Sequence, residues 1–419
     1  MADTAKEKNI RFPGGAFGLS LISFGLMNMV VFGGIFADKQ TESTLAKDVL
    51  NTKKAEMPSG SWTWWAAHGY FEDTKAPDVV MLGSSLVNSA CWAADAITTG
   101  RPVDCASHHR VFTLEKALKS DLNIASPRVV NVSVQGASAS DYYMMTRGLT
   151  ETGRKPKVLV IGIAPRDFID NKMQSLGATE PFMFYQRYVD FDDTVAKAYG
   201  NPYDRGMSEM EWRLGQLPLR KLHATVKPFL TDSKSASDTN VSNKDQLRLA
   251  LSNGAINIHP GDIVVPATMS DLWFDNTKEY VSRYKDPNPP TYKTQLFFFD
   301  ETLKRMNAEG IKVLVVEMPT LPMNRALLPD QFWTSYRSQL NELCKKNDAG
   351  YLDLSDSPDY VKADYVDTCH VNWRGGAKVL KRISEELANQ PHIAGILKST
   401  SNSDSDKSLV GVKSSTATH

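Results

Sequence analysis

The chain has 419 residues, of which 42% are hydrophobic and 23% are charged, as in an ordinary globular protein. Its 48 Lys and Arg residues balance its 48 Asp and Glu residues, so the formal net charge at pH 7 is zero. This balance argues against nucleic-acid binding driven by bulk charge, and the length suits one large domain or two of ordinary size.

A long apolar segment follows the polar N-terminus. Residues 16–37, AFGLSLISFGLMNMVVFGGIFA, contain no charged side chain and are long enough to cross a bilayer as a helix. Residues 1–15 carry Lys6, Lys8 and Arg11, which favour a cytoplasmic N-terminus. We therefore expect a single-pass membrane protein with a transmembrane anchor at 16–37 and the rest of the chain extracytoplasmic. A cleaved signal peptide is the alternative, and it would export the same residues.

Residues 38–76 are expected to form a polar stalk followed by an aromatic linker. The linker contains Ser61-Trp-Thr-Trp-Trp65 and Tyr70-Phe71. Clusters of this kind usually pack in a protein core, and an aromatic belt at the membrane interface is the alternative.

Five short apolar segments predict a parallel β-sheet in residues 77–397. Each segment is rich in Val, Ile and Leu, as expected of strands buried on both faces. The segments are 78–82, 128–134, 157–163, 311–316 and 351–354. Helical patterns lie between or after them, at 112–120, 139–151, 293–309, 329–347 and 373–389. Strands alternating with helices predict an α/β domain whose parallel sheet of about five strands carries helices on both faces.

Residues 168–290 interrupt this alternation, and we expect this insertion to form a cap or substrate cleft over the sheet. Helical patterns are confined to 190–200, 207–229 and 243–252, and residues 256–266 predict a strand or hairpin. At the C-terminus, residues 398–419 are rich in Ser and Thr and almost free of aromatic residues, so we expect them to be disordered.

Export would place the four cysteines in an oxidising compartment, where an even number favours disulfides. We expect the pairs Cys91–Cys105 and Cys344–Cys369, and four buried free thiols are the alternative. No close cysteine pair has the spacing of zinc ligands, so the sequence predicts no metal site. It predicts no cofactor either.

Two motifs at opposite ends of the domain supply the groups of a nucleophilic serine site. Gly83-Ser-Ser-Leu86 follows the first predicted strand and offers Ser85 as the nucleophile. Asp367-Thr-Cys-His370 offers His370 as the base that takes the serine proton, and Asp367 as the carboxylate that orients the imidazole ring. We therefore expect Ser85, His370 and Asp367 to converge.

Other residues offer the same chemistry with less support. Ser84 is the alternative nucleophile, and His108 or His109 is the alternative base, although neither has a carboxylate at short spacing. The remaining histidines that we considered are expected to be surface or core residues: His68, His223, His259 and His392.

These motifs resemble, in the same order, those of the SGNH/GDSL hydrolase superfamily. Gly136, in Val134-Gln-Gly-Ala137, is similar to the family's glycine block, and Ala164-Pro-Arg-Asp167 stands where the family has Gly-x-Asn-Asp. The resemblance implies a three-layer α/β fold and an oxyanion hole formed by the N–H groups of Ser85 and Gly136. The family's Asn is missing, and we expect Arg166 to replace it as the third donor.

Within that superfamily the predicted anchor and insertion resemble bacterial enzymes that modify envelope polymers, by D-alanylation of teichoic acids or O-acetylation of alginate. The resemblance implies transfer of an acyl group from a donor to a glycan through acyl-Ser85, with a membrane-bound O-acyltransferase as a partner. The alternatives are a simple exported carboxylesterase or lipase, and a non-catalytic accessory subunit of a polysaccharide-modification complex.

Overall fold

The computed structural model describes most of the chain between residues 60 and 399. The described ranges are 60–71, 75–150, 155–173, 175–186, 188–215, 258–266, 273–285 and 287–399. The predicted cytoplasmic segment, the anchor at 16–37 and the stalk before residue 60 lie outside them. So does the predicted tail at 398–419, except for residues 398 and 399, which are helical and not disordered as expected. In these ranges, no helix has the length and apolar character needed to cross a membrane.

Nearly all described residues belong to one compact unit, formed by residues 57–206 and 236–419. The other unit comprises residues 1–56 and 207–235, of which only 207–215 are described. Apart from residues 207–215, the elements described below belong to the larger unit.

A parallel sheet of five strands forms the centre of this unit. The strands are β1 (Val79–Gly83), β3 (Val129–Asn131), β4 (Val158–Ile163), β6 (Lys312–Glu317) and β7 (Gly350–Asp353). Their order is β3-β1-β4-β6-β7, and every neighbouring pair is parallel. Every residue of β1 and β4 is buried, which explains their unbroken apolar sequences. Each strand lies in or overlaps one of the five predicted segments, so the predicted sheet is confirmed.

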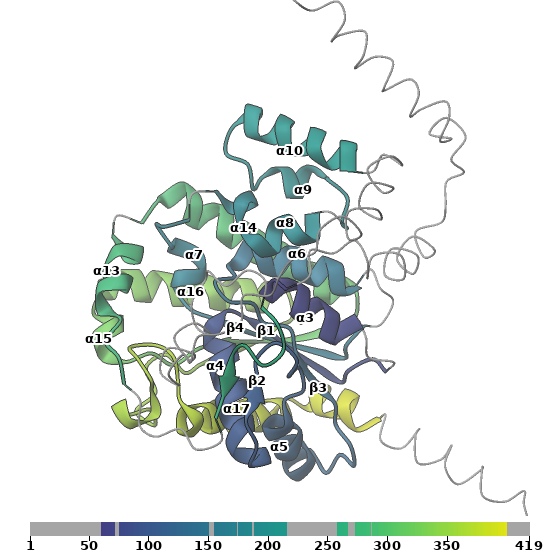
Figure 1. Ribbon diagram of the computed structural model, residues 1–419, viewed down its shortest axis with the longest axis vertical. Helices are drawn as coiled ribbons and strands as arrows, with labels where there is room; N and C mark the ends of the chain where they lie inside the picture. The colour runs from purple at the N-terminus through teal and green to yellow at the C-terminus, as the bar shows by residue number, and fades with distance from the viewer. Residues whose placement is uncertain are drawn as a thin grey trace, which may run out of the picture. The chain divides into compact units, whose positions relative to one another are not determined.

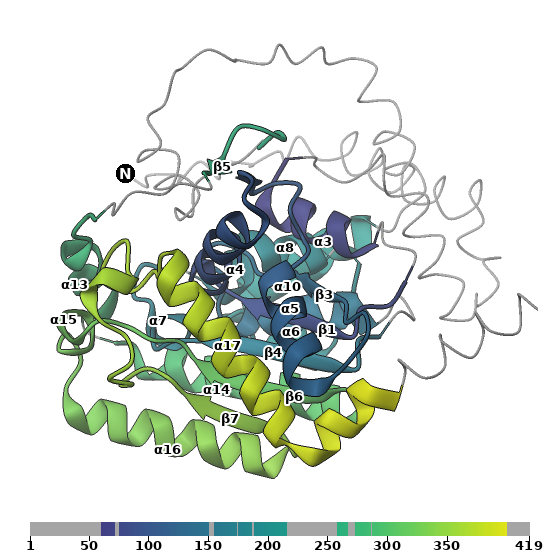
Figure 2. The ribbon, with the colours of Figure 1, turned by 90° about the horizontal axis from the view of Figure 1, so that it is seen from below.

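Helices cover both faces of the sheet (Figures 1 and 2). One face carries α4 (Ser85–Thr99), α5 (Phe112–Leu122) and α17 (Trp373–Asn389), which pack against one another. The other face carries α6 (Ala139–Thr150), α14 (Pro289–Ala308) and α16 (Asp330–Lys346). The predicted helices correspond to α5, α6, α14, α16 and α17, whereas α4 lies where no helix was expected.

The described part of the insertion is mostly short helices. They are α7 (Arg166–Ile169), a 3-10 turn (Leu176–Ala178), α8 (Glu180–Gln186), α9 (Asp193–Ala196), α10 (Pro202–Gly215) and α13 (Thr277–Tyr284). The strand predicted at 256–266 is present as β5 (Val264–Val265), which pairs antiparallel with β2 (Val103–Asp104). Later in the chain come α15 (Pro322–Arg325), a 3-10 turn (Lys362–Asp364) and a helical segment at 391–399.

The aromatic linker is helical where the structure describes it, and it packs into the core. Helix α3 (Trp62–Phe71) buries Trp62 and Tyr70. The ring of Trp62 lies 5.7 Å from that of Trp92 on α4. These contacts agree with the expectation that the tryptophan cluster is a core element.

Both predicted disulfides are wrong, because all four cysteines are buried free thiols. Cys344 lies near the end of α16, which precedes β7, whereas the thiol of Cys369 contacts His370 Nδ1 and the hydroxyl of Tyr280. Cys91 on α4 and Cys105 after β2 are separate thiols. Burial raises the pKa of both well above the usual value, so they stay protonated and poorly reactive.

Candidate active site

Three side chains from distant parts of the sequence form a continuous series of hydrogen bonds. The Oγ atom of Ser85 lies 2.8 Å from Nε2 of His370, although the two residues are 285 positions apart. The other ring nitrogen of His370, Nδ1, lies 2.6 Å from Oδ2 of Asp367. All three side chains are buried. The predicted convergence of these residues is therefore present in the structure.

A short loop before α17 fixes the orientation of the histidine ring. The second carboxylate oxygen of Asp367, Oδ1, accepts hydrogen bonds from the backbone N–H groups of Cys369 and His370, at 2.8 and 2.7 Å. Asn372 then caps α17 by accepting from the N–H groups of Arg374 and Gly375. The carboxylate of Asp367 thus bonds to the backbone of the loop and also to the imidazole ring. Both contacts require the chain between Asp367 and His370 to turn back on itself, as it does in a loop.

Glycines bring α4, which begins at Ser85, close to the sheet and to α17, which follows His370. A Cβ atom on Gly83 would lie 2.4 Å from Cγ2 of Val87 and 2.8 Å from the carbonyl oxygen of Gly162. A Cβ atom on Gly376 of α17 would lie 2.5 Å from the carbonyl oxygen of Ala90 on α4. Since neither position has room for a side chain, larger residues there would separate α4 from the sheet and from α17.

The charge of Asp367 controls the basicity of His370. Burial alone would lower the pKa of the imidazole, but the neighbouring carboxylate and its hydrogen bond outweigh burial and raise that pKa well above its usual value. Because the imidazolium is stabilised, the neutral imidazole is a stronger base. The arrangement therefore favours transfer of the Ser85 proton to Nε2.

Two backbone N–H groups are available to a negatively charged oxygen beside Ser85. Ser85 is the first residue of α4, so its N–H has no partner within the helix, and the helix dipole there favours negative charge. Gly136 lies in the third position of a turn closed by a hydrogen bond from Ala137 N to Val134 O, with φ of 75°. That position favours glycine. Among the residues described here, neither N–H donates a hydrogen bond.

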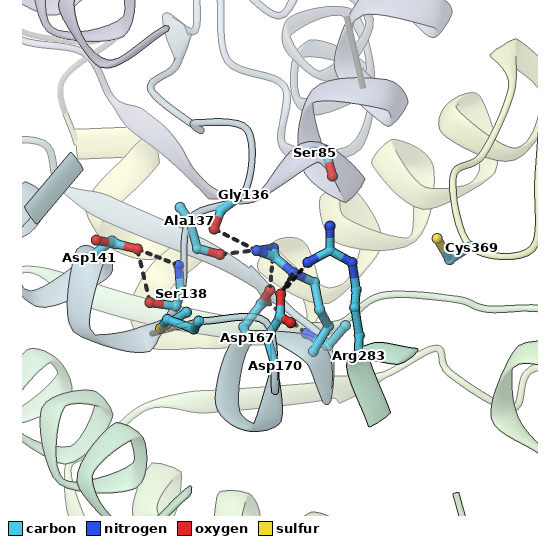
Figure 3. A network of polar contacts seen from close by, with 12 residues as sticks. Ser85, Gly136, Ala137, Ser138, Asp141, Asp167, Asp170, Arg283 and Cys369 are labelled. Atoms are coloured by element: carbon cyan, nitrogen blue, oxygen red, sulfur yellow. Dashed lines mark hydrogen bonds and ion pairs between the residues drawn. The ribbon is translucent and has the colours of Figure 1, made fainter. Parts of the chain in front are cut away.

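Arg166 lies against the Gly136 turn, and four of its five N–H groups donate to protein oxygens. Its Nη2 donates to the carbonyl oxygen of Gly136, and its Nη1 donates to that of Ala137 at 3.2 Å. Its other contacts are with the carboxylates of Asp167 and Asp170, each at 3.3 Å (Figure 3). The guanidinium thus holds the turn in place, and we expect it to position Gly136 instead of donating to a substrate as predicted.

The carboxylate of Asp167 anchors the start of α7. It accepts hydrogen bonds from the hydroxyl of Tyr142 at 2.9 Å and from the N–H of Ala164 at 3.0 Å. Burial, which outweighs the nearby Arg166 charge, raises the pKa of Asp167 to about 6. Asp141, also drawn in Figure 3, fixes the other end of the Gly136 loop by accepting from Ser138 N at 2.7 Å.

Helix α13 of the insertion supplies contacts that the sequence motifs did not predict. Arg283 forms an ion pair with Asp170, the same carboxylate that contacts Arg166. The hydroxyl of Tyr280 accepts from the thiol of Cys369 at 2.9 Å, next to His370. Before the helix, Oδ1 of Asn276 accepts from the backbone N–H of Thr368 at 3.1 Å. One element of the insertion therefore contacts both the base loop and the residues that hold the Gly136 turn.

The alternative bases have other partners. His108 Nε2 lies 2.8 Å from Asp95, whose carboxylate also accepts from the first N–H groups of α5. Asp95 is ten residues beyond Ser85 on α4, roughly 15 Å along the helix axis. His109 packs against Gly69 of α3. Ser84 is buried, and its hydroxyl has no partner among the described residues.

Asp367, Cys369 and His370 also hold three donor atoms within 4.8 Å of one another, as a metal site requires. However, His370 Nδ1 and Asp367 Oδ2 are only 2.6 Å apart. Two zinc ligands, each about 2 Å from a tetrahedral ion, lie more than about 3 Å from each other. The spacing fits a shared proton better than a shared metal ion.

No protein-family model matches this chain, and no curated protein matches it. Among solved structures, it is similar to a proposed acylhydrolase from Bacteroides fragilis, with 10% sequence identity and a TM-score of 0.31. The match covers 84% of this chain and 99% of the other.

Proposed function

We propose that this chain is a serine acyl-transfer enzyme of the SGNH type, an O-acyltransferase or esterase that forms an acyl-Ser85 intermediate. The observation that carries the proposal is the series of hydrogen bonds from Ser85 through His370 to Asp367, at 2.8 and 2.6 Å. A serine hydroxyl becomes nucleophilic when an oriented imidazole accepts its proton. The N–H groups of Ser85 and Gly136 supply the oxyanion hole that this chemistry needs.

In the first half of the reaction, Ser85 Oγ attacks the carbonyl carbon of the acyl donor while its proton passes to His370 Nε2. A C–O bond forms, and the carbonyl oxygen takes the displaced electron pair as an oxyanion. Collapse of this intermediate breaks the bond to the leaving group, which departs with the proton from His370. Asp367 stabilises the imidazolium throughout.

In the second half, a hydroxyl of the acceptor attacks the acyl-Ser85 ester and gives its proton to His370. When the new ester separates from Ser85, that proton returns to Oγ. A glycan hydroxyl as the acceptor gives acyl transfer, and water gives hydrolysis. Which of the two predominates depends on how well the insertion excludes water from the site.

We further propose that the enzyme acts at the outer side of a membrane, on a cell-envelope carbohydrate. The support is the uncharged segment at 16–37, preceded by Lys6, Lys8 and Arg11. A simple exported carboxylesterase would use the same residues. A non-catalytic accessory subunit is disfavoured, because it would have no need to keep Ser85 hydrogen-bonded to a histidine that faces a carboxylate.

The test is covalent labelling with a fluorophosphonate, followed by peptide mass spectrometry. The label should map to Ser85, be absent from Ser85→Ala, and persist in Ser84→Ala, which serves as the matched control. Nitrophenyl acetate with and without an oligosaccharide then separates the two reactions, since acetylated sugar indicates transfer and free acetate alone indicates hydrolysis. A wild-type protein that takes up no label would contradict the proposal.

A further inference from the structure

The oxyanion of the proposed reaction can accept one more hydrogen bond than the two backbone N–H groups donate. A tetrahedral oxyanion carries three lone pairs, and the backbone supplies two N–H groups, from Ser85 and Gly136. Arg166 is the nearest cation in the sequence motif, but all three of its nitrogen atoms donate to protein oxygens. Four of its five N–H groups are thus used within the protein, which favours another residue as the third donor.

The side chain of Gln135 is the candidate for this third donor. It is only 5% exposed, yet neither its amide nitrogen nor its amide oxygen has a hydrogen-bond partner in the described part of the chain. A buried amide without partners destabilises a protein, so most such groups are satisfied. A bound substrate or intermediate that supplies the missing hydrogen-bond partner would explain why this amide lies beside the site.

The backbone places Gln135 beside the nucleophile. Strands β1 and β3 pair in parallel from Val79 and Val129 onward. This pairing continues to a hydrogen bond from Val134 N to Gly83 O, at 3.0 Å. Beyond that bond, Ser84 and Ser85 follow in the first segment, and Gln135 and Gly136 follow in the second. Gln135 is thus the residue immediately before the Gly136 N–H, in the same turn.

We propose that Gln135 is a catalytic residue whose amide N–H donates the third hydrogen bond to the oxyanion formed on the acyl carbonyl. This inference rests on the proposed acyl-transfer function. The step moves no proton, since the amide donates to the oxygen while the negative charge is present and releases it on collapse. The same chemical group, a primary amide, thereby fills the role that the Ala164–Asp167 motif leaves vacant.

The experiment compares Gln135→Met, which keeps the size of the side chain but removes the donor, with wild type. We expect kcat for nitrophenyl acetate to fall about 10²–10³-fold, the usual effect of losing one oxyanion donor, with KM unchanged. The rate of fluorophosphonate labelling at Ser85 should fall in parallel. The melting temperature should be equal to or above that of wild type, because an unsatisfied buried amide has been removed.

Two further variants make the result decisive. Gln135→Glu has the shape of Gln without the amide donor, and its kcat should fall at least as far as that of Gln135→Met. Tyr185→Phe removes another buried polar group without a partner, on α8, and should keep wild-type kcat. Unchanged kcat in Gln135→Met, or a change in KM alone, would overturn the inference. Failure of the wild-type enzyme to be labelled would instead overturn the underlying acyl-transfer function.

Discussion

Replacing Asp367 by Asn tests the role of the carboxylate while preserving its shape. In the native protein Oδ1 accepts from two backbone N–H groups of the base loop, and Oδ2 faces Nδ1 of His370. An asparagine that keeps both backbone bonds must place its amide nitrogen at the Oδ2 position. That nitrogen donates, so Nδ1 must become the acceptor and the ring proton must move to Nε2.

With its proton on Nε2, the ring can no longer accept the proton of Ser85 at 2.8 Å. The same reversal lowers kcat about 10⁴-fold in other Ser-His-Asp enzymes. Four factors of ten correspond to about 5.4 kcal/mol of lost transition-state stabilisation. Folding should change little, because the two backbone bonds of the loop survive.

The assay is steady-state hydrolysis of nitrophenyl acetate, with thermal unfolding measured on the same samples. Asp364→Asn is the matched control: this carboxylate lies in the same segment but bonds to Val361 N and Lys378, and it should keep wild-type kcat. If Asp367→Asn retained kcat to within about tenfold, the tautomer argument and the base assignment would both be wrong.

Four further outcomes follow from the same geometry. The value of kcat/KM should rise with pH, and this rise should occur above the ordinary histidine pKa, since His370 must be neutral to act. The charged His370 imidazolium contributes stability that is fully present below the ordinary histidine pKa, and that is lost as pH rises through the raised pKa of His370. Asp170→Ala should lower the free energy of unfolding by ~3–5 kcal/mol in urea titrations, because it leaves two arginines partly uncompensated. Gly136→Ala should cost about 1–2 kcal/mol of stability at φ of 75° and also lower kcat, by displacing the N–H. All four thiols should react with a thiol reagent only after denaturation, and a reducing agent should leave the melting temperature unchanged.

The sheet and most of its helices were predictable because their signals are local. The residues of β1 and β4 are buried without exception, so each strand appears as an unbroken apolar run. Helix α4 was missed for a related reason. Every residue from Ser85 to Ala96 is buried, so the helix lacks the polar face whose 3.6-residue period identifies most helices.

The parts of the site that escaped prediction depend on long-range contacts. The Asp-x-x-His spacing places two of the three side chains in one loop, but no local pattern shows that Arg166 would bond to carbonyl groups of a turn thirty residues earlier. Arg283 reaches Asp170 across 113 positions, through an insertion without a regular pattern. An even number of cysteines likewise carries no information about the distance between their sulfur atoms.

Helix α13 bears on how this protein can be engineered. Because Tyr280 contacts Cys369 beside His370, and Arg283 contacts the carboxylate of Asp170 that also pairs with Arg166, the insertion is not a detachable accessory. A minimal version made by cutting back to the α/β scaffold would lose supports on both sides of Ser85. Any exchange of the insertion for a foreign one would therefore have to retain residues 276–283.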